Sequence, residues 1–236
     1  MGKRGIMKAV FTAFFFVIIL GSVGDMDVQA AAKAKYSYKK VNLSKTYNSG
    51  KVKAKVYYKK PVLKGKSSAV KKINKAISKD CKSFLASESV EAIYEYASDA
   101  AKYDPDTKEE YYYYATSKVT YNKKGIISIK VKTHWYAGGV VNTDVYGLNY
   151  SLKTGKKLYL TNVCRGSKKT IKNKILNKIY KDPDVASMDW DVLDAYQVKK
   201  MNFFIKPNKK AVVCFGPYEI CYGGWCRTYT IKSKYK

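Results

Sequence analysis

One short segment constrains the fold of this chain more than any other. Residues 51–56 read Lys-Val-Lys-Ala-Lys-Val, so lysine and apolar side chains alternate strictly. Because successive side chains of an extended strand point to opposite faces, this pattern predicts a strand with one lysine face and one apolar face. Lysines on such a strand also discourage edge-to-edge aggregation.

Further strand-like runs are separated by segments in which apolar residues recur at helical spacing. The predicted strands are 111–121, 126–135, 144–152 with an extension over 158–163, 201–206, 211–215 and 225–231. The predicted helices begin at Ser67 or Ser68 and at Glu88, carry Ile171, Ile175 and Ile179, and include a short one around Trp190, Leu193 and Tyr196. This order predicts an α+β fold with antiparallel β-rich sheets and two to four amphipathic helices.

Residues 1–30 have the three parts of a secretory signal peptide. A basic head precedes an uncharged apolar block over residues 9–21, and Val28-Gln29-Ala30 places small residues where a signal peptidase reads them. The block is shorter than the roughly 18 to 20 residues of a membrane-spanning helix, so we expect cleavage after Ala30 rather than an uncleaved anchor. The protein is therefore expected to be secreted or associated with the cell surface.

Lysine dominates the charge of the chain. After removal of residues 1–30 there remain 43 basic and 16 acidic residues, a net charge of +27, and only Arg4, Arg165 and Arg227 of the whole chain are arginine. Lysine is a hydrated point charge suited to diffuse attraction, whereas arginine recognises phosphate by a planar fork. We expect an anionic cell-wall polymer or peptidoglycan as partner, with peripheral membrane contact or a merely solvated surface as alternatives. The export signal and the scarcity of arginine argue against nucleic acid.

The acidic residues gather in two islands, which predicts an electrically polarised surface. The first consists of Glu88, Glu91, Glu95, Asp99, Asp104, Asp106, Glu109 and Glu110, and the second of Asp182, Asp184, Asp189, Asp191 and Asp194. Paired carboxylates beside Trp190 could hydrolyse a glycosidic bond, and the second island could bind calcium. Acids at a helix start are explained more simply by the helix dipole. We therefore expect no catalytic residue, no metal, no cofactor and no enzymatic activity.

Aromatic residues and glycines mark the candidate binding residues. The only histidine, His134, stands beside Trp135, Tyr136 and the flexible Gly138-Gly139, although no local catalytic signature accompanies it. Residues 111–114 are consecutive tyrosines, and exposed aromatic rings beside lysines can stack on sugars or bases. The candidate binding residues are His134, Trp135, Tyr136, Gly138, Gly139, Tyr218 and Trp225.

Five cysteines follow the signal segment, so at least one stays unpaired within the monomer. Cys221 and Cys226 flank Gly223-Gly224, where a chain reversal could bring them within bonding distance. We regard this pair as the disulfide candidate. A zinc site is a poor alternative, because there is one histidine and no pair of Cys-x-x-Cys motifs.

Several motifs give the chain a resemblance to a known family. They are Ala137-Gly138-Gly139, the run from Tyr150 to Leu158 with Thr154-Gly155-Lys156, Phe203-Phe204-Ile205, Val213-Cys214-Phe215, and Pro217-Tyr218-Glu219-Ile220 with Gly224. They resemble the extracellular domain shared by the anti-sigma factor RsiV and the non-catalytic part of the peptidoglycan deacetylase PdaC. The preceding segment, with Tyr57, Pro61, Val62 and residues 70–74, resembles the partner module found before that domain. We accordingly expect a disordered start over 31–47, an N-terminal module over 48–122 and an RsiV-like C-terminal module over 123–233.

The resemblance implies an extracellular α+β fold, lysozyme binding in the RsiV branch, and attachment to a wall-acting enzyme in PdaC. Two departures stand out: Val140 and Val141 follow the glycine pair where a histidine is common, and Cys221 and Cys226 occupy usually apolar or small positions. We expect no sigma-binding segment before the signal and therefore no anti-sigma activity, and no deacetylase metal motif is present in the sequence. We expect a secreted, non-enzymatic binding protein of the bacterial cell envelope, with lysozyme binding or inhibition as one alternative and an unrecognised wall hydrolase as another.

Overall fold

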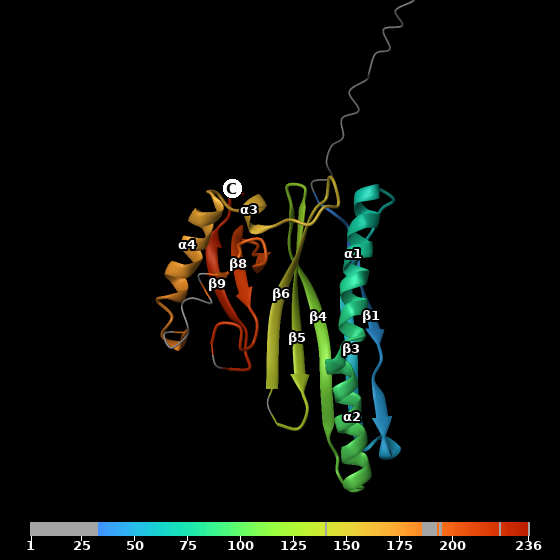
Figure 1. The fold of residues 1–236 in the computed structure, drawn as a ribbon. Coiled ribbons are helices and arrows are strands. Elements are labelled where there is room, and N and C mark those ends of the chain that lie inside the picture. The colour runs from blue at the N-terminus through green and yellow to red at the C-terminus, as the bar shows by residue number, and fades with distance from the viewer. Residues whose placement is uncertain (1–32, 140, 186–192, 194, 222, 236) are drawn as a thin grey trace, which may run out of the picture.

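A computed structural model describes residues 33–139, 141–185, 193, 195–221 and 223–235. The predicted signal segment lies outside them, as does most of the predicted short helix around residue 193. The protein has two β-sheets with helices packed beside them, which confirms the predicted α+β class (Figure 1). Among the described residues, no helix is both long and apolar enough to cross a membrane.

The larger sheet has six strands in the order β1-β3-β4-β5-β6, with the short β2 also paired to β3. Their bounds are β1 Tyr36–Asn42, β2 Lys45–Tyr47, β3 Val52–Leu63, β4 Glu110–Lys123, β5 Ile126–Tyr136 and β6 Val141–Ser151. A single-turn 3-10 segment, Asn48–Gly50, links β2 to β3. All pairs in this sheet are antiparallel except β3–β4, which is parallel.

The parallel pair is connected by α1 (Ser68–Leu85) and α2 (Glu88–Tyr103), which lie end to end along one face of the sheet (Figure 1). Ser67 caps α1 by accepting a hydrogen bond from the Val70 backbone N–H at 3.2 Å. The apolar stripe of α1, including Ile73, Ile77 and Phe84, is buried against the sheet, as its spacing predicted. The helices therefore cover the apolar side of β3 and β4 and leave the lysine side open.

The second sheet has the strand order β7-β8-β9. It packs against the face of β6 that is turned away from α1 and α2. Its elements are β7 Asn202–Ile205, β8 Lys210–Phe215 and β9 Arg227–Lys232, accompanied by α3 Leu160–Val163, α4 Lys168–Ile179 and a 3-10 turn at Pro183–Val185. Gly147 lets the sheets meet, because a Cβ atom there would stand 1.6 Å from the Phe203 carbonyl oxygen. Side chains confirm the contact, since the Asn149 amide donates to that same oxygen at 2.6 Å.

Two sequence predictions need correction. The start over 31–47 was expected to be disordered, but β1 and β2 occupy most of it and pair with β3. Residues 158–163 were expected to extend a strand, but α3 begins at Leu160, because the Asn162 side chain accepts from the Tyr159 backbone N–H at 2.8 Å and favours a helical turn. The expected module boundary at 122/123 falls in the β4–β5 hairpin, where Gly125 has a φ of +71°, and the division into modules stays a prediction.

Candidate functional site

The predicted binding residues of β5 are divided between two surfaces. Strand alternation places His134 and Tyr136 on the face of the sheet that the helices leave open, whereas Trp135 packs toward α2. The candidate residues therefore belong to two separate features: an open sheet face and a cavity beside α2.

The open face carries a row of aromatic rings that crosses three strands. Tyr57 of β3 stacks on Tyr114 of β4 with ring centroids 4.8 Å apart, and Tyr114 stacks on His134 of β5 at 5.1 Å. Tyr112 and Tyr136 form a second pair at 5.4 Å, beside the first row. All five rings are partly exposed, and because the stacked rings of the row cover one another's faces, it is their outward edges that a ligand can reach.

Lysines surround this row. Lys40 lies over the Tyr57 ring at 3.9 Å and Lys59 lies 5.4 Å from the Tyr38 ring, both cation–π contacts from neighbouring strands. Lys53 and Lys118 are exposed, and Lys55, Lys130 and Lys132 are partly exposed. The aromatic–lysine face is defined here as Tyr57, Tyr112, Tyr114, His134, Tyr136, Lys40, Lys53, Lys55, Lys59 and Lys132.

The charge of this face is almost entirely positive. Glu110 and Asp144 are the only acidic residues in the sequences of β1, β3, β4, β5 and β6. The Glu110 carboxylate pairs with Lys55 at 3.1 Å and raises the pKa of that amine. Burial and the charge of Lys132 lower the pKa of His134 below its ordinary value of 6.5, which favours the neutral imidazole.

The row continues beyond β5 to another predicted residue. His134 pairs with Thr143 of β6, and Thr143 forms a bridge with Trp225, donating its backbone N–H to Gly224 at 2.9 Å. Trp225 is 55% exposed, and the Arg227 guanidinium lies 5.8 Å from its ring. The structure thus brings His134 and Trp225, 91 positions apart in the sequence, to the same edge of the sheet.

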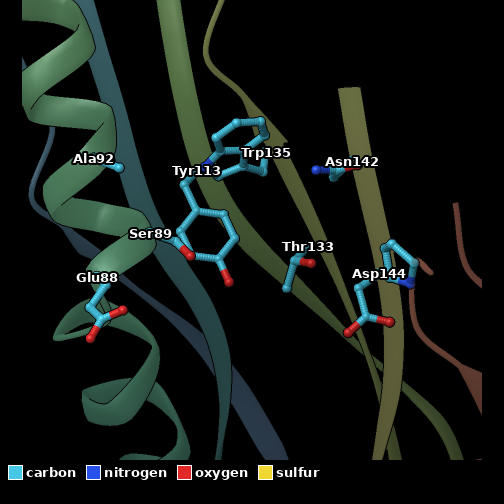
Figure 2. A pocket seen from close by; sticks show the side chains of 9 residues that line it. Glu88, Ser89, Ala92, Tyr113, Thr133, Trp135, Asn142 and Asp144 are labelled. Atoms are coloured by element: carbon cyan, nitrogen blue, oxygen red, sulfur yellow. The ribbon is translucent and has the colours of Figure 1, made fainter. Parts of the chain in front are cut away.

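The second feature is a cavity of about 480 Å³ on the helix side of the sheet. Glu88 of α2 lines one side of it, Trp135 and Tyr113 contribute aromatic walls, and Asp144 and Asn142 of β6 line the other side (Figure 2). Pro217, from the loop after β8, closes the β6 end. Segments of α2, β4, β5, β6 and the loop after β8 therefore meet at this cavity, and sequence reasoning did not find it because α2 and that loop are far from β6 in the sequence.

Two carboxyl groups lie close together at the β6 end of the cavity. An atom at the Cβ position of Gly216 would be 3.4 Å from both Asp144 Oδ1 and Glu219 Oε2. Burial raises the pKa of Asp144, opposed by a hydrogen bond that its carboxylate accepts from the Val145 backbone N–H at 2.6 Å. Burial also raises the pKa of Glu219, and the nearby charge of Asp144 raises it further, although Glu219 accepts from the Gly216 backbone N–H.

The remaining predicted residues line neither feature. Gly138 and Gly139 lie beyond the end of β5, and Gly138 has a φ of +81° with Tyr111 beside it. Tyr218 is 58% exposed in the loop after β8, where its backbone N–H donates to the Gly223 carbonyl at 3.1 Å.

The second acidic island is engaged within the fold where it is described. Asp182 accepts from the Tyr229 hydroxyl at 2.8 Å, and Asp184 pairs with Arg227 at 2.8 Å. Asp189, Asp191 and Asp194 lie outside the described residues. Within the described part of the chain, no group of three or more histidine, cysteine, aspartate or glutamate side chains is arranged to hold a metal ion.

The two cysteines of the predicted bridge, Cys221 and Cys226, have different surroundings in this structure. All five cysteines are free thiols in this structure, and Cys221 accepts a hydrogen bond from Arg227 Nε at 3.4 Å. Cys226 packs instead against Cys214, in the cluster that Val145 and Phe204 form between the two sheets. The reason is that residues 224–226 pair with β6, which turns Cys226 toward β8 rather than back toward Cys221.

Comparison with known proteins places this architecture in a known fold. A crystal structure of a DUF3298 family member from Bacteroides fragilis matches with a TM-score of 0.56 and 14% identity, covering 85% of this chain and 91% of that one. A DUF3298 family protein from Pseudomonas aeruginosa matches with a TM-score of 0.48 and 14% identity, over 84% and 91% of the two chains. The first likeness shows that the two proteins share a fold.

The sequence comparison is more specific. Residues 47–140, which contain β3, α1, α2, β4 and β5, match the family model described as deacetylase PdaC. No curated protein matches the chain significantly. Together with the shared fold, the PdaC match confirms the resemblance that the sequence motifs predicted. The matched segment contains most of the aromatic–lysine face and part of the cavity.

Proposed function

We propose that this protein is exported and acts, without enzymatic activity, as a binding protein of the bacterial cell envelope. Its ligand is an anionic wall polymer, which lies across the aromatic–lysine face. The observation that carries the proposal is the row Tyr57–Tyr114–His134, a stacked platform bordered by lysines with one acidic residue, Glu110, among them. The predicted export signal is what supports the location, because export would bring this face into contact with wall polymers.

The geometry suits an extended, repeating anion. Adjacent strands of a sheet lie about 4.8 Å apart, so lysines on β1, β3 and β5 form a spaced array rather than a single phosphate pocket. The outward edges and hydroxyl groups of the partly exposed tyrosine rings add apolar and polar contacts for sugar units. Such binding is distributed over many contacts, and releasing counterions makes its affinity fall steeply with salt.

The test compares two sets of lysines with equal charge change. The triple variant Lys40→Gln, Lys59→Gln, Lys132→Gln removes three charges from the aromatic–lysine face. The control Lys71→Gln, Lys75→Gln, Lys79→Gln removes three exposed charges from α1, on the helix side of the sheet. Retention on walls that carry the anionic polymer, and on walls stripped of it, is measured over a range of salt concentrations.

We expect the face variant to lose affinity and to reduce the slope of log K against log salt by about two units. The α1 control should change both quantities much less, because its lysines point away from the polymer. Equal losses in the two triple variants would contradict a defined binding face, and undiminished retention on stripped walls would contradict the anionic ligand. N-terminal sequencing of secreted protein, beginning at or just after Ala31, tests the export that the proposal requires.

A second candidate function, lysozyme binding, is favoured by the exposed surface of α2. Glu91, Glu95 and Asp99 are exposed there, and no ion pair engages them within the described part of the chain. Because many lysozymes are basic, acids would be needed at the interface to overcome like-charge repulsion. Replacing these three acids by lysine should abolish binding to a basic lysozyme and leave wall adhesion unchanged or stronger. Absence of calorimetric binding by the unchanged protein at physiological salt would rule this function out.

A further inference from the structure

The cavity beside α2 carries charge opposite in sign to the net charge of the protein. The chain after residue 30 carries a net charge of +27, yet Asp144 and Glu88 line this cavity and Glu219 lies next to Asp144. None of these three carboxylates forms an ion pair within the described residues. Because no lysine of the described part of the chain neutralises these carboxylates, the cavity can bind a cation supplied by a ligand.

We propose that this cavity binds an organic cation, an alkylammonium or guanidinium group, held between the indole ring of Trp135 and the carboxylates of Asp144 and Glu88. The site goes beyond the proposed polymer binding, since it lies on the other face of the sheet and uses different residues.

The electrostatic argument rests on the surroundings of Asp144. Its carboxylate is partly buried and has one backbone donor, Val145, so its negative charge is only partly compensated. Glu219 places a second carboxylate nearby, and its own donor is the Gly216 backbone N–H. Two neighbouring carboxylates with one amide donor each are stabilised in their charged form when a cation enters between or beside them.

The cavity walls favour an organic cation over a metal ion. Trp135 and Tyr113 present aromatic surfaces, and the face of an aromatic ring attracts an alkylammonium or guanidinium within about 6 Å. The volume of about 480 Å³ accommodates an amine with several carbon atoms. A metal ion would need several converging ligands, and no such group of three occurs in the described part of the chain.

Asn142 supplies a further polar group. Its Oδ1 atom is buried without a hydrogen-bond partner, and an atom at the Cβ position of Gly224 would be 2.4 Å from it. Because the two ends of a side-chain amide exchange by a rotation of 180°, Asn142 can turn its oxygen toward the cavity. With Asp144, Glu88 and the Ser89 hydroxyl, the ammonium would then meet acceptors on several sides.

The first experiment identifies the chemistry with small probes. Nα-acetyl-lysine amide and Nα-acetyl-arginine amide are titrated into the protein, and the indole N–H signals of the tryptophans are followed by NMR. The neutral analogue Nα-acetyl-norleucine amide is the control ligand. We expect the cations to shift the Trp135 signal and to bind at least about tenfold more tightly than the neutral analogue. Equal binding of the neutral analogue, or a shift confined to Trp225, would overturn the proposal.

Variants locate the site. Asp144→Asn should lower the affinity for acetyl-lysine amide about tenfold, and Trp135→Leu should lower it about fivefold. The matched controls Glu95→Gln, on the exposed side of α2, and Trp225→Leu, on the opposite face of the sheet, should leave it unchanged. Circular dichroism and a melting curve show that each variant is folded. Folded Asp144→Asn protein with unchanged affinity would overturn the proposal, whatever the outcome for wall-polymer binding.

Competition experiments distinguish two sources of the cation. Wall peptides with a free amine, and the same peptides after N-acetylation, test a wall ligand. A lysine-rich protein, native and lysine-acetylated, tests a protein ligand. Displacement of acetyl-lysine amide by the free-amine member of either pair, and not by its acetylated form, supports the site and assigns its source. Displacement by neither would contradict a cation site of biological use.

Discussion

His134 and Trp135 are consecutive residues of β5, yet their side chains lie on opposite faces of the six-stranded sheet. His134 stacks on Tyr114 with ring centroids 5.1 Å apart, whereas Trp135 lines the cavity beside α2. A ligand bound flat on one face cannot reach the other side chain. Substitutions at these two neighbours therefore separate polymer binding from cation binding within one protein.

His134 should make polymer binding depend on pH. The groups around it are Tyr114 from β4, Lys132 from β5 and Thr143 from β6, and its pKa lies below 6.5 because of burial and the Lys132 charge. When the pH is lowered from 7.5 to a value below this pKa, His134 gains a positive charge beside the polymer. Affinity for a polymer whose own charge is constant should rise roughly two- to fivefold, the effect of one exposed ion pair.

His134→Gln should remove this rise while leaving binding at pH 7.5 nearly unchanged. Titrations at both pH values on the same immobilised polymer provide the measurement. An equal rise in the variant would show that another group titrates. The same pKa shift makes the folded state less stable as pH falls below 6.5, because the unfolded chain then binds the proton more readily. Melting curves at each pH therefore accompany the titrations.

Gly147 should be among the least replaceable residues of the protein. A Cβ atom there would stand 1.6 Å from the Phe203 carbonyl oxygen, so alanine would force the two sheets apart. We expect Gly147→Ala to destabilise the fold by about 3 kcal/mol or more, as overpacking against backbone does. Gly139→Ala is the matched control, since a Cβ there has no atom within 4 Å. Urea unfolding of both variants measures the difference, and similar midpoints would contradict this close packing.

Much of the fold followed from local patterns. The alternating lysines of 51–56, the Ser67 cap with the apolar stripe of α1, and Gly125 in the β4–β5 turn each carry their signal within a few residues. Strand β1 carries no such signal, because most of its side chains are exposed. It is held by backbone pairing with β3, a long-range contact that its own sequence does not indicate.

The candidate site was predictable only in part, for a related reason. The sequence indicated aromatic residues beside lysines, but the row Tyr57–Tyr114–His134 depends on the register of the parallel β3–β4 pair. The cavity depends on how α2 and the loop after β8 approach β6, which is set by packing between distant segments. The sequence also predicted an electrically polarised surface. In the structure, the aromatic–lysine face is the positive part and the exposed acidic residues of α2 are a negative part.

Asp144 should make the stability of the protein fall as pH rises. Its pKa is raised by burial above the ordinary value of 3.8, so the folded state holds the proton more tightly than the unfolded chain. In the window from 3.8 up to the raised pKa, each increase in pH then costs stability, and the loss is complete above that window. Asp144→Asn should therefore melt at a higher temperature than the unchanged protein at pH 7.5, and at a similar one at pH 3.5.

The exposed Asp99→Asn of α2 is the control for the effect of removing one negative charge, and it should show no such pH-dependent gain. Differential scanning calorimetry at several pH values gives the comparison. A gain for Asp144→Asn that is the same at pH 3.5 and 7.5 would show that packing rather than ionisation is responsible.

Oxidation should link Cys214 to Cys226 and leave Cys221 free. Cys226 packs against Cys214, whereas the Cys221 sulfur accepts from Arg227. The hydrogen bond from the Cys214 thiol lowers the pKa of Cys226, which favours its thiolate as the attacking sulfur. With diamide as oxidant, the Cys226 thiolate adds to the azo bond and forms an S–N bond. Cys214 then attacks the Cys226 sulfur, so that the S–S bond forms, the S–N bond breaks, and the hydrazine leaves with the two electrons and two protons. Peptide mapping after alkylation should find this pair, together with a gain of about 2–3 kcal/mol in unfolding free energy. Cys221→Ser should leave both results unchanged, and a Cys221–Cys226 peptide as the main product would show that the loop after β8 rearranges before it is oxidised.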